Sequence, residues 1–281
     1  MLLRFEERLS DSPFVERIWR TQSERAGSFI SLALSHWQMC IWRYDGKTTL
    51  TVRGPETKAT PSPVPENAEY IGIVFKLGTF MPHLPASNLV DGATNLPEAT
   101  SKSFWLNSAS WQFPDYENVD TFVDRLMRDG LLVREPVVDA TLQGQLTDLS
   151  LRSTQRRFLR ATGLTHSAVY QIERARRATI LLRQGVSILD TVQEAGYADQ
   201  PHLTRSLKYF SGQTPAQIID ANRSEQLSFL FKTAPITGDT MQMVNNQSRE
   251  DLHEKANRLG VPDIGRRYGS AREMAVSLHQ R

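Results

Sequence analysis

The stretch S-L-R-S-T-Q-R-R-F-L-R-A-T-G, residues 150–163, decides the fold of the C-terminal part, because a second stretch repeats its design. The second reads A-D-Q-P-H-L-T-R-S-L-K-Y-F-S-G and covers residues 198–212. Each begins with a helix-capping residue at or next to its start, carries Arg, Gln or His in its first turns and ends on glycine. A helix of this kind has the shape that enters the major groove of DNA. The repetition predicts two such helices.

Charge is distributed unevenly along the chain. Residues 1–149 hold 14 Lys or Arg against 19 Asp or Glu, a net charge of −5. Residues 150–223 hold 11 against 5, a net charge of +6, and residues 224–281 hold 8 against 7, a net charge of +1. The positive charge lies in the segment that contains the two stretches, as expected of a nucleic-acid contact. A merely solvated basic face would not by itself repeat at the first turns of both helices.

The first stretch predicts a helix from the cap Ser150 to about residue 162. Phe158 and Leu159 are expected to point inward. The opposite face then carries the candidate base-reading side chains Arg152, Gln155 and Arg156. Arg157 and Arg160 are either phosphate contacts or solvated surface, and the sequence leaves these two alternatives open.

The second stretch predicts the second helix of a helix-turn-helix. Apolar residues recur at spacings that let two short helices cross, with Gly196 at the turn; they are Ile188, Val192, Ala195, Leu203 and Leu207. The outward side chains are then Gln200, His202, Arg205 and Lys208. Gln can bind adenine and Arg can bind guanine through two hydrogen bonds each, whereas Lys208 lies farther along the helix and suits a phosphate.

Between the two units, residues 165–184 predict one long helix that ends at Gly185. Such a helix of roughly 18 residues is about 27 Å long. Together with the width of the packed helices, this places the two reading helices about 34 Å apart, near one turn of a duplex. Both could then enter successive major grooves on one side of the DNA.

Four motifs in order carry a family resemblance over about 70 residues, a length that suits one small helical domain. They are S-x-R-x-x-Q-R-x-F-x-x-x-x-G, E-R-A-R-R-A-x-x-L-L, S-I-x-x-x-V-x-E-A-G-Y-x-D-Q and G-Q-T-P, all within residues 150–218. This segment resembles the DNA-binding domain of the AraC/XylS family of bacterial transcription regulators. The resemblance implies double-stranded DNA as partner. It also implies base-reading positions at Arg152, Gln155 and Arg156 in the first unit, and at Gln200, Pro201, His202 and Arg205 in the second.

Two positions depart from the family pattern. Pro201 occupies a reading position but has no amide donor, which suits the first turn of a helix and limits its contacts to apolar ones. Leu207 replaces the phenylalanine that is usual before Lys208, a change that affects packing more than recognition.

The first 135 residues are expected to be rich in β-strands. β-Branched and aromatic residues predict strands at residues 28–34, 39–44, 47–53 and 70–77, and Asp45-Gly46 is a hairpin signal. Three prolines within residues 60–67 exclude a strand or helix interior and predict a loop. Apolar residues at helical spacing over residues 118–130 predict a helix that covers the strands or pairs with a second subunit.

The same part is similar to the effector domains of AraC/XylS regulators, which are often cupin-like barrels. The segments L-V-D-G-A-T-N-L-P and S-F-W-L-N-S-A-S-W-Q-F-P carry this likeness. It implies a sensor that tunes DNA binding or the recruitment of RNA polymerase, and a homodimer. The expected fold class is α+β: an N-terminal cupin-like β-barrel or sandwich with a flanking helix, an all-α double helix-turn-helix and a short helical tail.

All five tryptophans lie in this N-terminal part: Trp19, Trp37, Trp42, Trp105 and Trp111. They either pack a small β core or line a ligand pocket, since ligand pockets are largely apolar and aromatic. The candidates for a pocket are Trp37, Trp42 and Trp111. The apolar strands hold no charged cluster, which favours a small hydrophobic or aromatic effector. The competing hypothesis is a β-rich domain that binds no ligand and only assembles subunits.

Three regions are therefore predicted: residues 1–135 as a β-rich effector and dimerisation domain, 136–223 as the DNA-binding domain, and 224–281 as a linker with a small helical tail. Within the tail, residues 249–262 and 265–278 are similar to the helix-extended-helix module at the front of Rho termination factors, although Asp263-Ile264 departs from that pattern. If so, Arg266 and Arg267 would add phosphate contacts. The alternative is a plain helical or partly disordered tail.

Other functions have weaker support in the sequence. A single cysteine, Cys40, excludes an internal disulfide and a thiolate metal cluster, and it is expected to be a small core residue. Only His36 and His83 precede residue 150, and neither has the His-x-His spacing of a cupin metal site, so no catalytic residue, metal or cofactor is expected. A cupin-type metalloenzyme is the remote alternative. No apolar run reaches the ~18 residues of a membrane span, and the N-terminus has no signal-peptide core, so a cytoplasmic protein is expected.

Overall fold

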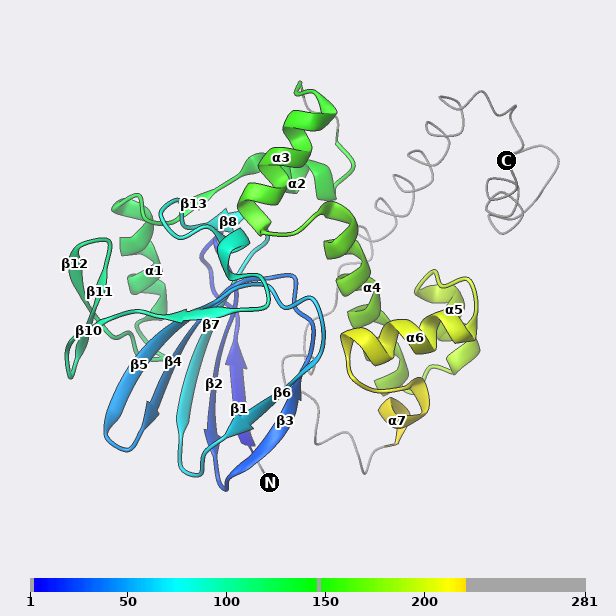
Figure 1. The fold of residues 1–281 in the computed structure, drawn as a ribbon, viewed down its shortest axis with the longest axis horizontal. Coiled ribbons are helices and arrows are strands. Elements are labelled where there is room, and N and C mark those ends of the chain that lie inside the picture. The colour runs from blue at the N-terminus through cyan, green and yellow to red at the C-terminus, as the bar shows by residue number, and fades with distance from the viewer. Residues whose placement is uncertain (1–2, 146–147, 221–281) are drawn as a thin grey trace.

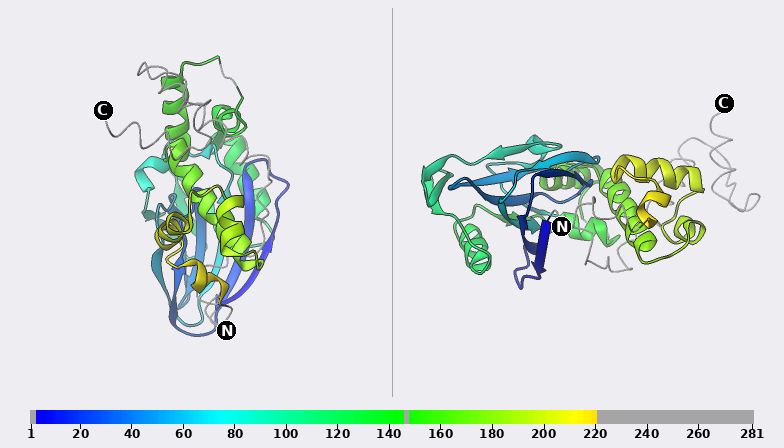
Figure 2. Two further views of the ribbon diagram at one scale, coloured as in Figure 1. Left: turned by 90° about the vertical axis from the view of Figure 1, so that its right-hand side faces the viewer. Right: turned by 90° about the horizontal axis from the view of Figure 1, so that it is seen from below.

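The computed structural model describes residues 3–145 and 148–220, and the predicted tail at residues 224–281 lies outside them (Figure 1). Strands dominate the chain as far as Arg134, and helices follow from Pro136. Figure 2 shows the helical part beside one end of the strand-rich part. We call residues 3–134 the β-rich part and residues 136–220 the helical part.

A six-stranded antiparallel sheet forms the centre of the β-rich part. Its order is β1 (Leu3–Arg8), β2 (Val15–Ser23), β7 (Glu69–Phe75), β4 (Gln38–Tyr44), β5 (Lys47–Arg53) and β9 (Ala93–Asn95). Asp45 and Gly46 join β4 to β5 with φ angles of 49° and 72°, so the predicted hairpin is confirmed. Alternate residues of these strands face one core, among them Ile18, Met39, Ile41, Leu50, Ile73 and Phe75.

Helix α1 (Val119–Arg128) covers this core, as the spacing of its apolar residues predicts. It buries Val119, Phe122, Val123 and Leu126 in the cluster that the sheet forms. A small sheet of β10 (Glu98–Thr100), β11 (Ser103–Leu106) and β12 (Ala109–Gln112) lies next to it and contributes Phe104, Leu106 and Trp111. The opposite face of the large sheet holds Cys40 beside Trp19, where burial raises the pKa of the thiol to about 12.

The prediction of a loop at residues 60–67 is wrong for the first five of these residues. Strand β6 (Thr60–Val64) pairs antiparallel with β3 (Gly27–Ser31) in a two-stranded sheet. Pro61 and Pro63 are two residues apart, so their nitrogens, which cannot donate, face the same side of the strand. A two-stranded sheet has a free edge on which proline is tolerated.

The described strands form open sheets of six, three, two and two strands. The strand-rich N-terminal part is therefore confirmed, whereas the cupin-like barrel is not. The remaining short elements are β8 (Thr79–Phe80), paired with β13 (Val133–Arg134), and the 3-10 helix η1 (Ala86–Leu89).

Six helices form the helical part: α2 (Pro136–Leu142), α3 (Leu151–Thr162), α4 (His166–Arg183), α5 (Ile188–Glu194), α6 (Gln200–Phe210) and α7 (Pro215–Ile219). The predicted cap Ser150 accepts a hydrogen bond from the backbone amide three residues on, and Thr165, Ser187 and Asp199 cap α4, α5 and α6 in the same way.

The β-rich part and the first helices share one apolar core. It joins Ala33 and Phe80 of the β-rich part to Phe158, Ala161 and Ile172 of the helical part. Gly163 ends α3 with a φ of 76°, and a Cβ atom there would lie 2.9 Å from the carbonyl carbon of Ala86. The backbone of η1 therefore approaches the α3–α4 turn more closely than a residue with a side chain allows.

Candidate nucleic-acid interface

Helix α3 exposes a stripe of side chains that suits DNA contact. Arg152, Gln155 and Arg156 are exposed, as predicted. Phe158 is buried, but Leu159 is 43% exposed, so the prediction that both point inward is wrong for Leu159. Neighbouring helix residues differ in direction by about 100°, and Phe158 already takes the inward position. Leu159 instead follows Arg152, Gln155 and Arg156 at spacings of 7, 4 and 3, which places all four on one face.

Arg157 and Arg160 point toward other parts of the protein. The Nη1 atom of Arg157 lies 3.6 Å from Oε1 of Glu135 in a half-exposed ion pair. The guanidinium of Arg160 lies 5.9 Å from the centre of the Phe80 ring. The sequence leaves open whether these two arginines contact phosphate or are solvated surface. Their contacts within the protein argue against the phosphate contact.

Helices α5 and α6 form the second unit around the predicted core. Val192, Ala195, Leu203 and Leu207 are buried together, and Ile188 packs against them. Asp199 accepts a 2.7 Å hydrogen bond from the amide of His202 and so fixes the start of α6. The side chains predicted to read or contact DNA are exposed at Gln200, Pro201, Arg205 and Lys208.

His202 is half-buried, unlike its neighbours on α6. Its ring meets the ring of Tyr197 edge to face, with 5.1 Å between centroids. Burial lowers the pKa of His202, and the nearby guanidinium of Arg174 lowers the pKa further. A neutral imidazole can donate and accept hydrogen bonds at a base edge, but it lacks the positive charge that attracts phosphate.

Arg174 is a residue of the interface that the sequence reasoning did not single out. Its guanidinium lies 4.3 Å from the Tyr197 ring centre and 5.3 Å from that of Tyr170, and it donates a 3.5 Å hydrogen bond to the carbonyl of Gly196. Arg174 thus connects α4 to the turn that precedes α6. The signal was present, because Arg174 belongs to the quoted E-R-A-R-R-A motif.

Helix α4, with 18 residues, connects the two units. Val169 and Ile172 in its first half pack with Phe158 of α3. Ala178 and Leu182 in its second half pack with α5 and α6, which lie toward the other end of α4 in Figure 1. The predicted separation of about one duplex turn between α3 and α6 stays a prediction.

The end of α6 is held by the β-rich part. The last carbonyl groups of a helix have no partner within the helix. Here the amide of Ala33 donates to the carbonyl oxygen of Phe210 at 2.9 Å, and the amide of Ala59 donates to that of Tyr209 at 3.0 Å. Just beyond, a Cβ atom at Gly212 would lie 3.2 Å from the side chain of Ile30. The second unit is therefore in direct backbone contact with the β-rich part.

A largely buried charged group adds a second contact between the two parts. Ser35 donates a 2.5 Å hydrogen bond to Oε1 of Glu173 on α4, and Nδ1 of His36 lies 3.9 Å from the same oxygen. Burial alone would raise the pKa of Glu173, but Arg176, His36, the Ser35 hydrogen bond and Arg17 together lower it. Burial lowers the pKa of His36. The lowered pKa of Glu173 favours an ionised carboxylate in this cluster, close to the guanidinium of Arg176.

The three tryptophans proposed for an effector pocket lie in different surroundings. Trp37 is buried and stacks on Phe75 at 4.0 Å, and its Nε1 donates to the Thr79 carbonyl. Trp111 is buried in the same core. Trp42 is half-buried and lines a hollow of about 310 Å³ beside β5 and β9. An effector site made of these three residues stays a prediction.

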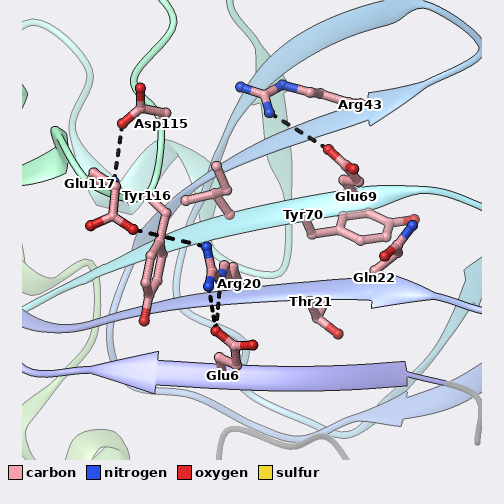
Figure 3. A pocket seen from close by; sticks show the side chains of 11 residues that line it. Glu6, Arg20, Thr21, Gln22, Arg43, Glu69, Tyr70, Asp115, Tyr116 and Glu117 are labelled. Atoms are coloured by element: carbon pink, nitrogen blue, oxygen red, sulfur yellow. Dashed lines mark hydrogen bonds and ion pairs between the residues drawn. The ribbon is translucent and has the colours of Figure 1, made fainter.

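A larger hollow of about 430 Å³ lies where β1, β2, β7 and β4 meet residues 115–117 (Figure 3). Most of the side chains that line it are charged or polar, and Tyr70, Ile71 and Tyr116 add apolar surface. Arg20 donates hydrogen bonds of 2.8 and 2.6 Å to Glu6 and lies over the Tyr116 ring, and Arg43 lies 3.6 Å from Glu69. The ion pairs in this lining distinguish it from the largely apolar pocket expected for a hydrophobic or aromatic effector.

Among residues 3–145 and 148–220, three or more His, Cys, Asp or Glu side chains nowhere gather as a metal site would require. Within the same described residues, no helix has the length and apolar character to cross a membrane.

The helix-turn-helix of α5 and α6, together with the exposed face of α3 at the other half of α4, gives the helical part the arrangement of a DNA-binding region. Residues 145–221 match a family model described as a helix-turn-helix domain, and this match supports a regulator of the AraC type. Comparison of the chain with curated proteins and with solved structures found no match.

Proposed function

We propose that this protein regulates transcription by binding a specific double-stranded DNA site through α3 and α6, in the cytoplasm and without a cofactor. The observation that carries the proposal is the pair of exposed polar helix faces attached to the two halves of α4. The segment that contains them also holds the excess of positive charge, +6 over residues 150–223. Phosphate attraction then supplies affinity, and the side chains on α3 and α6 supply specificity.

The exposed side chains suggest a role for each position. Arg152, Arg156 and Arg205 can each bind the O6 and N7 atoms of guanine. Gln155 and Gln200 can bind adenine in the same two-point manner. His202, held neutral, offers hydrogen bonds to a base edge, Pro201 offers an apolar contact, and Lys208 lies three residues after Arg205 and binds phosphate.

The β-rich part is proposed to control the orientation of α6. Its amides at Ala33 and Ala59 bind the end of α6, and Ser35 binds Glu173 on α4. A small effector that moves the segment 33–36 on binding would change the position of α6 relative to α3. The alternative is a β-rich part that only forms a homodimer. Saturable thermal stabilisation by a metabolite favours the effector, and sedimentation of the free protein reports the dimer.

The experiment that tests DNA binding is a selection of duplexes from a random-sequence pool with the full chain, followed by affinity measurements on the selected duplex. Arg152→Ala and Arg205→Ala should each lose about 1–3 kcal/mol of binding free energy. Arg128→Ala, an exposed arginine on α1, is the matched control and should bind as the unchanged protein does. Equal binding by all four proteins would refute the assignment of α3 and α6 as reading helices.

A further inference from the structure

Leu159 is an apolar side chain beside the polar side chains of Gln155 and Arg156 on α3, a helix whose first residue, Leu151, is also exposed. Leu159 is 43% exposed and follows Arg152, Gln155 and Arg156 on the same face. Exposure of a large apolar side chain to water is unfavourable, and a protein can avoid it when the side chain meets another apolar surface on binding. Single apolar side chains on a surface are common, so the exposure of Leu159 alone requires no contact. Its place on the face of Gln155 and Arg156 is what makes Leu159 available to a duplex bound by α3.

Two contacts on other sides of α3 hold this face outward. Phe158 is buried in the core that α3 shares with α4 and the β-rich part. Arg157 pairs with Glu135, which precedes α2. A rotation of α3 that buried Leu159 would withdraw Phe158 from its core and break this ion pair. Leu159 must therefore remain on the face that Gln155 and Arg156 share.

The chemistry of the major groove identifies the contact. Bases present donors and acceptors there to Arg and Gln, and the apolar group they present is the C5-methyl of thymine. Leucine has no donor or acceptor, so it can distinguish a base pair only through that methyl group. We propose that Leu159 is a specificity-determining residue that packs against a thymine methyl in the half-site bound by α3. This inference rests on the proposed DNA-binding function.

The test removes the methyl group without changing any hydrogen bond of the base. Each thymine of the selected duplex is replaced in turn by uracil, and the dissociation constant is measured for the unchanged protein and for Leu159→Ala. Loss of one buried methyl group should weaken binding about fourfold. We expect this loss at one or two adjacent thymines for the unchanged protein and none there for Leu159→Ala.

Two further variants complete the design. Leu159→Met keeps an apolar side chain and should keep the dependence on the methyl group. Leu189→Ala removes another exposed leucine, on α5, and should leave the dependence unchanged. If the unchanged protein and Leu159→Ala respond alike to every uracil, the inference is wrong while the DNA-binding function stands. If no duplex is selected at all, the proposed function fails and the inference fails with it.

Discussion

The backbone amide of Ala33 and the carbonyl oxygen of Phe210 form a 2.9 Å hydrogen bond that joins the β-rich part to the end of α6. The same segment continues to Ser35, whose hydroxyl reaches Glu173 on α4. Residues 33–35 thus contact both the helix proposed to read DNA and the helix that supports it. This short segment is the most direct route by which a change in the β-rich part could reach α6.

The amides of Ala33 and Ala59 should exchange their hydrogens slowly, because each is engaged with a carbonyl group of α6. Hydrogen exchange followed by NMR measures this, with the amide of Gly46 at the β4–β5 turn as a fast-exchanging reference. Exchange of Ala33 and Ala59 at the rate of Gly46 would show that the two parts separate readily in solution.

Glu173→Ala should destabilise the protein by about 3–5 kcal/mol, because it removes a buried carboxylate that faces Arg176 and accepts the Ser35 hydrogen bond. Urea unfolding followed by circular dichroism measures the change. The control is Glu194→Ala, an exposed residue of α5, for which a change within about 0.5 kcal/mol is expected. Similar values for both variants would contradict a structural role for the buried cluster.

His202 should titrate below about 6.5, the usual value for histidine, because burial and Arg174 lower its pKa. Its contribution to stability is therefore present above the unfolded pKa and is lost as the pH falls through the folded value. An NMR titration of the His202 ring gives the midpoint directly. Arg174→Gln should raise that midpoint. A midpoint at or above 6.5 in the unchanged protein would contradict the proposal that His202 contacts a base edge as a neutral imidazole.

Gly163→Ala should destabilise the protein more than Gly185→Ala. Both glycines have positive φ angles, 76° and 88°, so alanine strains the backbone at either position by about 1 kcal/mol. At Gly163 the new Cβ would also meet the Ala86 backbone at 2.9 Å, whereas at Gly185 it has no neighbour within 4 Å. Thermal unfolding of the two variants isolates the effect of this close approach, and equal losses would argue against it.

Local signals in the sequence were enough to place the helices. The helices expected from Ser150, from Thr165 and from the start of the second stretch begin where they were expected to, because a cap acts within three residues of itself. The spacing of residues along a helix also predicted the exposure of most candidate DNA contacts. The inward direction predicted for Leu159 is wrong, because its neighbour Phe158 takes the buried position.

Contacts between distant segments could not be predicted in this way. The pairing of β6 with β3 depends on a partner about 30 residues away and on a free sheet edge, neither of which the prolines of β6 reveal. The bonds from Ala33 and Ala59 to α6 involve backbone atoms alone, so no side chain in the sequence marks them. The same holds for the approach of η1 to Gly163, where only the glycine is a signal.

Because α4 continues without interruption through its 18 residues, it fixes the distance between α3 and the pair of helices α5 and α6. One base pair inserted between the two halves of a binding site would shift the second half by about 3.4 Å along the duplex axis and by roughly a tenth of a turn around it. A stiff helix cannot follow that displacement without breaking its own packing. The distance between the halves of a target would then be selected as strictly as the bases within them.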